Sequence, residues 1–96
     1  MATLQRISGT GRARIGTRWV DAHFEYEYFS PDESDQPTDE CWSVRLKEAD
    51  AEALGLLHGE RVQLLLPDRE PADVWLRASR FKGGLAWLEF LPAITV

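Results

Sequence analysis

Apolar and polar residues alternate with a period of two over much of this chain, most clearly in residues 20–29. Successive side chains of a β-strand point to opposite faces, so this alternation predicts a strand with one buried and one exposed face. The inward face is expected to be apolar and rich in aromatic residues: Val20, Ala22, Phe24, Tyr26 and Tyr28. The outward face is expected to be polar: Asp21, His23, Glu25 and Glu27.

Residues 5–15 alternate in the same way and predict a second strand, joined to the first by a short connection. If Ile15 lies opposite Val20, then Gly11 lies opposite Phe24. This pairing is favourable because an aromatic ring can cover the backbone that a glycine leaves bare. We therefore predict an antiparallel hairpin in this register, which places the apolar residues of both strands on one side.

Charge is distributed unevenly over these two segments. Residues 1–20 contain four arginines and no acidic residue, whereas residues 21–44 contain eight acidic residues and no lysine or arginine. The predicted register places Arg14 across from Asp21, so we expect the two blocks to neutralise each other on one outer face. The formal net charge is −5, which disfavours binding to the phosphates of nucleic acid.

The rest of the chain predicts four further strands and one short helix. Residues 48–54 favour a helix, and Gly55 follows at the position where glycine commonly ends one. Residues 85–91 are apolar on both faces, so this strand should be central or lie at an interface. The remaining strands are expected at residues 41–47, 61–66 and 74–81, with a tight turn at 82–84. We therefore expect one domain over residues 1–96, a mainly β fold that is a small six-stranded antiparallel β-barrel or sandwich with one short helix.

Residues 30–40 differ in composition from the predicted strands. They contain two prolines, several acidic residues and no apolar residue. Because such a segment has nothing to bury, we expect a mobile acidic loop that proteases cut first.

Length and composition are those of a single globular domain. The chain has 96 residues, of which 44% are hydrophobic, and it contains no apolar run long enough to cross a bilayer. Its first residues lead directly into polar sequence, so we expect no signal peptide. Cys41 is the only cysteine, which excludes a disulfide within the chain and a cysteine-rich zinc site. A bacterial, cytoplasmic protein is the simplest interpretation.

An aromatic surface is the first candidate for function. Trp75 is out of phase with the apolar residues beside it and shares a strand face with Arg77 and Phe81. We predict that these residues and Trp87 bind a protein partner or a second copy of the chain, because a 96-residue chain has a limited core in which to bury them. The expected function is that of a non-catalytic binding or interaction module, and self-association is expected to give a homodimer. The alternative is that the sheet closes and covers this face itself.

A second candidate comes from two short motifs. Arg14 and Arg18 form an Arg-x-x-x-Arg motif, and Asp32 and Ser34 follow within an acidic segment. Together they resemble the PilZ family, small β-barrels that bind cyclic di-GMP through an Arg-x-x-x-Arg motif and a later Asp-x-Ser-x-x-Gly motif. Pro37 stands where that second motif has its glycine. The resemblance implies that these two arginines, the aspartate and the serine bind nucleotide, which makes a cyclic dinucleotide sensor the alternative function.

Catalytic and metal-binding chemistry are both disfavoured by the sequence. No serine lies in a hydrolase motif, and the two acidic residues before Cys41 disfavour its thiolate. His23, Glu25 and Glu27 could bind Zn²⁺ or Mn²⁺ together with His58. A row of ligands along one strand splays outward, however, and the arginines expected opposite would repel a cation. We therefore expect no catalytic residue, no metal site and no cofactor.

Overall fold

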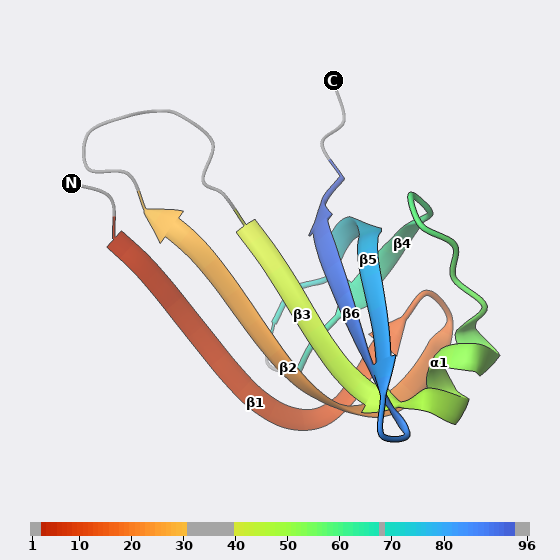
Figure 1. Ribbon diagram of the computed structural model, residues 1–96. Helices are drawn as coiled ribbons and strands as arrows, with labels where there is room; N and C mark the ends of the chain where they lie inside the picture. Colours follow the sequence, from red (N-terminus) through yellow and green to blue (C-terminus); the bar gives the residue numbers. More distant parts are fainter. Residues whose placement is uncertain (1–2, 31–39, 68, 94–96) are drawn as a thin grey trace.

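The computed structural model describes residues 3–30, 40–67 and 69–93, which form six antiparallel strands and one short helix. The strands close into a barrel in the order β1-β2-β3-β6-β5-β4 (Figure 1). The mainly β fold with one short helix is as predicted, and of the two predicted architectures it is the barrel. The elements are β1 (Thr3–Ile15), β2 (Arg18–Ser30), β3 (Glu40–Lys47), α1 (Glu48–Leu54), β4 (Arg61–Leu65), β5 (Ala72–Lys82) and β6 (Leu85–Pro92).

Inward-pointing side chains from all six strands fill the barrel. Phe90 and Val44 are completely buried at its centre, and each such side chain stabilises the fold by roughly 1.5–3 kcal/mol relative to an exposed position. β6 is central, as predicted, because it pairs with β3 on one side and with β5 on the other. The buried residues of these three strands are Trp42, Val44, Leu46, Val74, Leu76, Ala86, Leu88 and Phe90.

The β1–β2 hairpin is antiparallel, but the predicted register is wrong by two residues. Ile15 pairs with Arg18 and not with Val20, because the connection is a two-residue turn at residues 16–17. Such a short turn suits the twist of two paired strands. A shift of two residues keeps every side chain on its predicted face, so Ala13 is buried and Arg12 is exposed.

The same shift changes which glycine lies beneath an aromatic ring. Gly11 lies opposite Ala22, and Gly9 lies opposite Phe24. A Cβ atom at residue 9 would stand 3.0 Å from Cζ of Phe24, which is closer than ordinary van der Waals contact. An aromatic ring therefore covers the backbone of a glycine, as predicted, but at Gly9 and not at Gly11.

Opposite charges do face each other across β1 and β2, with partners that differ from the predicted ones. Arg12, and not Arg14, lies opposite Asp21. Nε of Arg6 lies 2.8 Å from Oε1 of Glu27 in an ion pair. The basic and acidic blocks thus share the outer surface of the hairpin.

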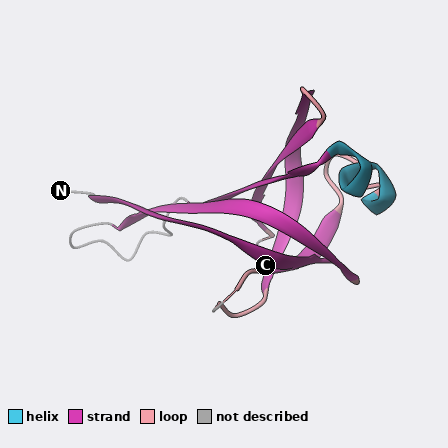
Figure 2. Ribbon diagram, turned by 90° about the horizontal axis from the view of Figure 1, so that it is seen from below, coloured by secondary structure: helices cyan, strands magenta, loops and turns pink. Residues whose placement is uncertain are grey.

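Only the end of β1 closes the barrel. β1 pairs with β2 at all of its residues, whereas on its other side Arg14 and Ile15 alone pair with β4. Figures 1 and 2 show the rest of the β1–β2 hairpin extending away from the barrel on the side of the N-terminus. The closing seam between β1 and β4 is therefore the shortest strand pairing of the barrel.

The helix α1 follows β3 directly at one end of the barrel (Figure 1). Ala51 is buried against the core and Leu54 packs partly against it. Gly55 ends the helix in the left-handed conformation, with φ 61° and ψ 28°. Its backbone N–H donates to the carbonyl oxygens of Ala51 and Glu52. The helix and its terminating glycine are both as predicted.

A register shift in β5 changes the face on which its last residues lie. Leu76 pairs with Phe90 and Ala78 with Glu89, so Arg77 is the extra residue of a β-bulge. Beyond the bulge, Ser79 and Phe81 lie opposite the buried residues of β6, Leu88 and Ala86. The prediction that Trp75, Arg77 and Phe81 share one face is therefore wrong, because alternation was assumed to be unbroken.

The predicted acidic loop at residues 30–40 lies largely outside the described residues. Its first and last residues, Ser30 and Glu40, belong to β2 and β3. Its mobility stays a prediction.

Candidate functional site

The outer surface of the barrel carries a cationic and aromatic cluster that spans three strands. On β6, Trp87 points outward between its two buried neighbours in sequence. It lies opposite Arg45 of β3 on one side and opposite Arg80 of β5 on the other. Residues that are directly opposite in antiparallel strands point to the same face, so an indole lies between two arginines.

The neighbouring outward-facing position of β6 also holds an apolar side chain between two basic ones. Leu85 lies between Lys47 of β3 and Lys82 of β5, and both lysines are exposed. Two consecutive rows across the barrel thus hold an apolar side chain between two cations. We call this surface the Trp87 face; its residues are Ser43, Arg45, Lys47, Arg77, Ala78, Arg80, Lys82, Leu85, Trp87 and Glu89.

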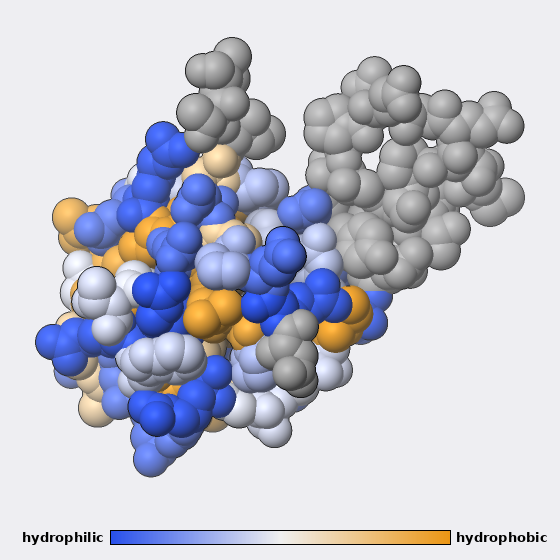
Figure 3. Space-filling view, turned by 180° about the vertical axis from the view of Figure 1, so that it is seen from behind, coloured by the Kyte–Doolittle hydropathy of each residue, from blue (hydrophilic) through white to orange (hydrophobic). Residues whose placement is uncertain are grey.

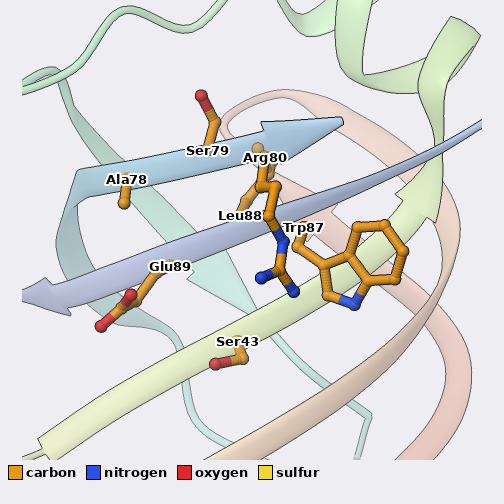
Figure 4. Close-up of a pocket in the computed structure, with 7 residues that line it drawn as sticks. All are labelled: Ser43, Ala78, Ser79, Arg80, Trp87, Leu88 and Glu89. Atoms are coloured by element: carbon orange, nitrogen blue, oxygen red, sulfur yellow. The ribbon is translucent and has the colours of Figure 1, made fainter. Parts of the chain in front are cut away.

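Part of the Trp87 face lines an open hollow of about 450 Å³, whose lining residues are Ser43, Ala78, Ser79, Arg80, Trp87, Leu88 and Glu89. The guanidinium carbon of Arg80 lies 5.2 Å from the ring centroid of Trp87, within cation–π distance. Figure 4 shows the Arg80 guanidinium group between the Trp87 ring and Glu89, with Ser43 on the same side of the sheet. Ser79 points to the other side of the sheet, as the bulge requires.

Glu89 is the acidic residue of this face, and it already has partners. Its Oε1 lies 3.5 Å from Nη1 of Arg77 and accepts a hydrogen bond from the thiol of Cys41 at 3.5 Å. Burial, followed by the negative charge of Glu89 and its hydrogen bond, together raise the pKa of Cys41 to about 11. The thiol is therefore neutral at physiological pH.

Three of the four predicted partner-binding residues lie on the outer side of the barrel. Arg77 and Trp87 belong to the Trp87 face. Trp75 is half-buried opposite Leu91 and lines a separate shallow hollow with Arg61 and Pro92.

Phe81 is the fourth, and it lies on the other side of the sheet. The bulge turns Phe81 to this side, opposite Ala86. The residue is 50% exposed there, near the end of β5. The four predicted residues therefore do not form one surface.

Sequence reasoning missed Arg80 and the lysines that flank Leu85. The outward positions of Arg45 and Lys47 follow from the alternation in β3. Arg80 could not be placed, because the bulge at Arg77 reverses the phase of the end of β5. The signal that could have found the cluster is the pair of basic residues Arg80 and Lys82, which lie two positions apart just before the turn at residues 83–84.

The two arginines of the PilZ-like motif lie where β1 and β2 meet. Arg14 donates to Oε1 of Gln63 at 2.6 Å and to the carbonyl oxygen of Gly16 at 3.3 Å. Arg18 pairs with Ile15 beside the turn and is exposed. Asp32 and Ser34 lie outside the described residues, so the structure does not show whether the two motifs meet.

A second hollow, of about 420 Å³, lies near these arginines. Trp19 is 51% exposed there, and the guanidinium carbon of Arg12 lies 5.7 Å from its ring centroid. Arg69 lines the same hollow, which is bounded by Pro67 and Glu70 at the end of β4.

Groups that could carry catalysis or bind a metal are few in the described part of the chain. No group of three or more histidine, cysteine or acidic side chains that could hold a metal ion is found among these residues. Nε2 of His58 lies 2.9 Å from Oγ of Ser79 at an exposed position. Over the described ranges, no helix is long and apolar enough to cross a membrane.

Figure 3 shows the molecule from behind, where hydrophobic residues lie in small patches separated by hydrophilic ones. Comparisons with protein families, with curated proteins and with solved structures found no match for this chain.

Proposed function

We propose that this chain is a non-catalytic binding module of the cytoplasm. Its Trp87 face binds an acidic segment of a partner protein. The observation that carries this proposal is the row of Arg45, Trp87 and Arg80 across three neighbouring strands. At protein interfaces a few residues contribute most of the binding energy, and tryptophan and arginine are enriched among them. Arginine also keeps its positive charge and binds carboxylates with two hydrogen bonds at once.

Local charge favours an acidic partner. The chain as a whole is acidic, with a formal net charge of −5, but the rows through Leu85 and Trp87 hold four cations and no acidic residue. Such a patch attracts carboxylates at a distance and orients them on approach.

The same charge argues against self-association through this face. In a two-fold dimer each patch would meet an identical patch, so cations would lie opposite cations. A partner of opposite charge avoids this repulsion. Of the two partners expected from the sequence, another protein is therefore favoured here over a second copy.

A titration with an acidic peptide tests the proposal. The probe is a short, fluorescently labelled peptide of glutamate and aspartate with a central phenylalanine, and binding is followed by fluorescence anisotropy. The double variant Arg45→Glu/Arg80→Glu should bind at least about tenfold more weakly, which corresponds to about 1.4 kcal/mol. Trp87→Ala should weaken binding to a similar extent, and added salt should weaken binding to the wild type.

Matched controls separate this face from the general charge of the chain. Arg18→Glu/Arg69→Glu makes the same charge change elsewhere, and Trp19→Ala removes another exposed tryptophan. Both should leave peptide affinity within about twofold of the wild type. Equal loss of affinity in the control and test pairs, or equal affinity for a lysine-rich version of the peptide, would contradict the proposal.

A cyclic dinucleotide is the second candidate ligand. It is favoured by the hollow beside Trp19, where an exposed indole lies among the cationic groups of Arg12 and Arg69. Cyclic di-GMP should then quench tryptophan fluorescence, and Trp19→Phe should abolish the quenching. Loss of binding in Arg14→Ala/Arg18→Ala would support the PilZ-like motif, whereas unchanged binding in that variant would exclude it.

A further inference from the structure

The strand β1 has an open edge. It pairs with β2 over its full length, but on its other side β4 reaches only Arg14 and Ile15. Over residues 3–13, no strand in the described part of the chain pairs with this second side. Alternate backbone N–H and C=O groups of an edge strand point away from its partner, so this edge can accept another strand.

Residues 5–11 of this edge lack two of the features that usually prevent strand addition. Proteins protect open edges with prolines, with lysines or with covering elements. Residues 5–11 contain no proline and no lysine. Their single charged side chain, Arg6, is held in an ion pair by Glu27 of the neighbouring strand. Ile7 is 37% exposed on this part of β1.

We propose that β1 pairs antiparallel with β1 of a second copy of this chain, about a two-fold axis beside Ile7. The axis brings the two Ile7 side chains together and removes an exposed apolar group from water on each subunit. The outer edges of the two β1 strands then pair within one continuous sheet, and every contact away from the axis occurs twice, as in other closed dimers.

Charge selects this position of the axis. An axis at Ile7 places Arg6 opposite Ser8 of the partner subunit, and the pairing ends before Arg12 is reached. An axis at Gly9 would instead place Arg6 opposite Arg12 of the partner subunit, where like charges repel. The same reasoning favours a second copy over a random peptide, because the edge is self-complementary in length, polarity and charge in this register.

The proposed dimer is independent of the binding function proposed for the Trp87 face. That face lies on β3, β6 and β5, and β2 separates β1 from β3 in the barrel. Both Trp87 faces would stay accessible, so the dimer would present two of them to a partner with repeated acidic segments.

Sedimentation of the full chain over a range of concentrations tests the dimer. The chain has a mass of 10.9 kDa, and the wild type should approach twice that mass as its concentration rises. Ile7→Lys places two positive charges at the axis and should weaken the dimer at least about tenfold. Ser8→Glu places a carboxylate opposite Arg6 of the partner subunit and should strengthen it.

Controls keep folding and binding apart from dimerisation. Thr17→Lys adds the same charge as Ile7→Lys in the exposed hairpin turn and should leave the dimer intact. Circular dichroism reports whether each variant is folded, and the opposite effect of Ser8→Glu cannot arise from unfolding. Ile7→Lys should bind the acidic peptide with unchanged affinity per subunit, so failure of either proposal can be recognised separately. A wild type that stays at 10.9 kDa, or a dimer unaffected by both edge variants, would overturn the inference.

Discussion

Cys41 shows how the surroundings of a single residue set its chemistry. Its thiol lies at the start of β3, half-buried beside the carboxylate of Glu89. The sequence correctly predicts a disfavoured thiolate, but it assigns the effect to the two acidic residues that precede Cys41. In the structure the main causes are burial and Glu89, which is 48 residues away in the chain and adjacent in space.

We expect Cys41 to react slowly with iodoacetamide near neutral pH, because only the thiolate is nucleophilic and the pKa is raised to about 11. The alkylation rate should increase about tenfold per pH unit up to that pKa. Glu89→Gln removes a negative charge beside the thiol, so it should lower the pKa and increase the rate near pH 8.

Mass spectrometry of the alkylated chain measures this rate. Glu52→Gln, which removes an exposed carboxylate from α1, serves as the control and should leave the rate unchanged. A rate for Glu89→Gln equal to that of the wild type would show that this carboxylate does not control the thiol.

At the scale of secondary-structure elements, α1 depends on the residue that ends it. The helix has only seven residues, and its last turn is completed by the backbone N–H of Gly55 in a left-handed conformation. A Cβ atom at this position would contact nothing within 4 Å. Any cost of a side chain at Gly55 therefore comes from the backbone conformation alone.

Gly55→Ala is expected to lower the free energy of unfolding by about 1–2 kcal/mol, because L-residues with a side chain rarely adopt this conformation. Gly55→Asn should cost less, since asparagine tolerates it better. Urea denaturation followed by circular dichroism measures both changes. Equal stability of Gly55→Ala and the wild type would mean that the helix ends differently in solution.

The strands also show where local pattern is sufficient and where it is not. In β3 the alternation is unbroken, and Trp42, Val44 and Leu46 are buried as predicted. In β5 the bulge at Arg77 changes the phase, so the predicted faces are correct for Trp75 and wrong for Phe81. A bulge arises from hydrogen bonding to the neighbouring strand, which no pattern within β5 reveals.

At the scale of the whole molecule, the barrel is closed by its shortest pairing. β1 and β4 share two residue pairs, reinforced by the hydrogen bond from Arg14 to Gln63 and by one from the Gly16 N–H to the Gln63 carbonyl oxygen. β6, in contrast, is paired with a neighbour on each side along most of its length. Segments with few contacts open at lower free energy than the rest of a fold.

Native-state hydrogen exchange should reflect this difference. We expect a peptide covering β4 to exchange at least about tenfold faster than a peptide covering β6, because opening of the seam exposes β4 without global unfolding. Gln63→Ala removes the side-chain bond to Arg14 and should increase exchange in β4 while leaving β6 unchanged. Equal exchange in both strands would indicate that the barrel opens only as a whole.

The sequence by itself determined the class of fold, the faces of most strands and the position of the helix with Gly55. These features depend on period-two alternation and on the preferences of single residues, which are properties of the local chain. Tertiary structure alone decided the hairpin register, the bulge in β5 and the closure of the barrel. It also decided the Trp87 face, because Arg45, Trp87 and Arg80 belong to three strands whose pairing fixes which of their side chains meet. That pairing results from hydrogen bonds and packing between distant segments, so it is not encoded in the pattern of any one of them.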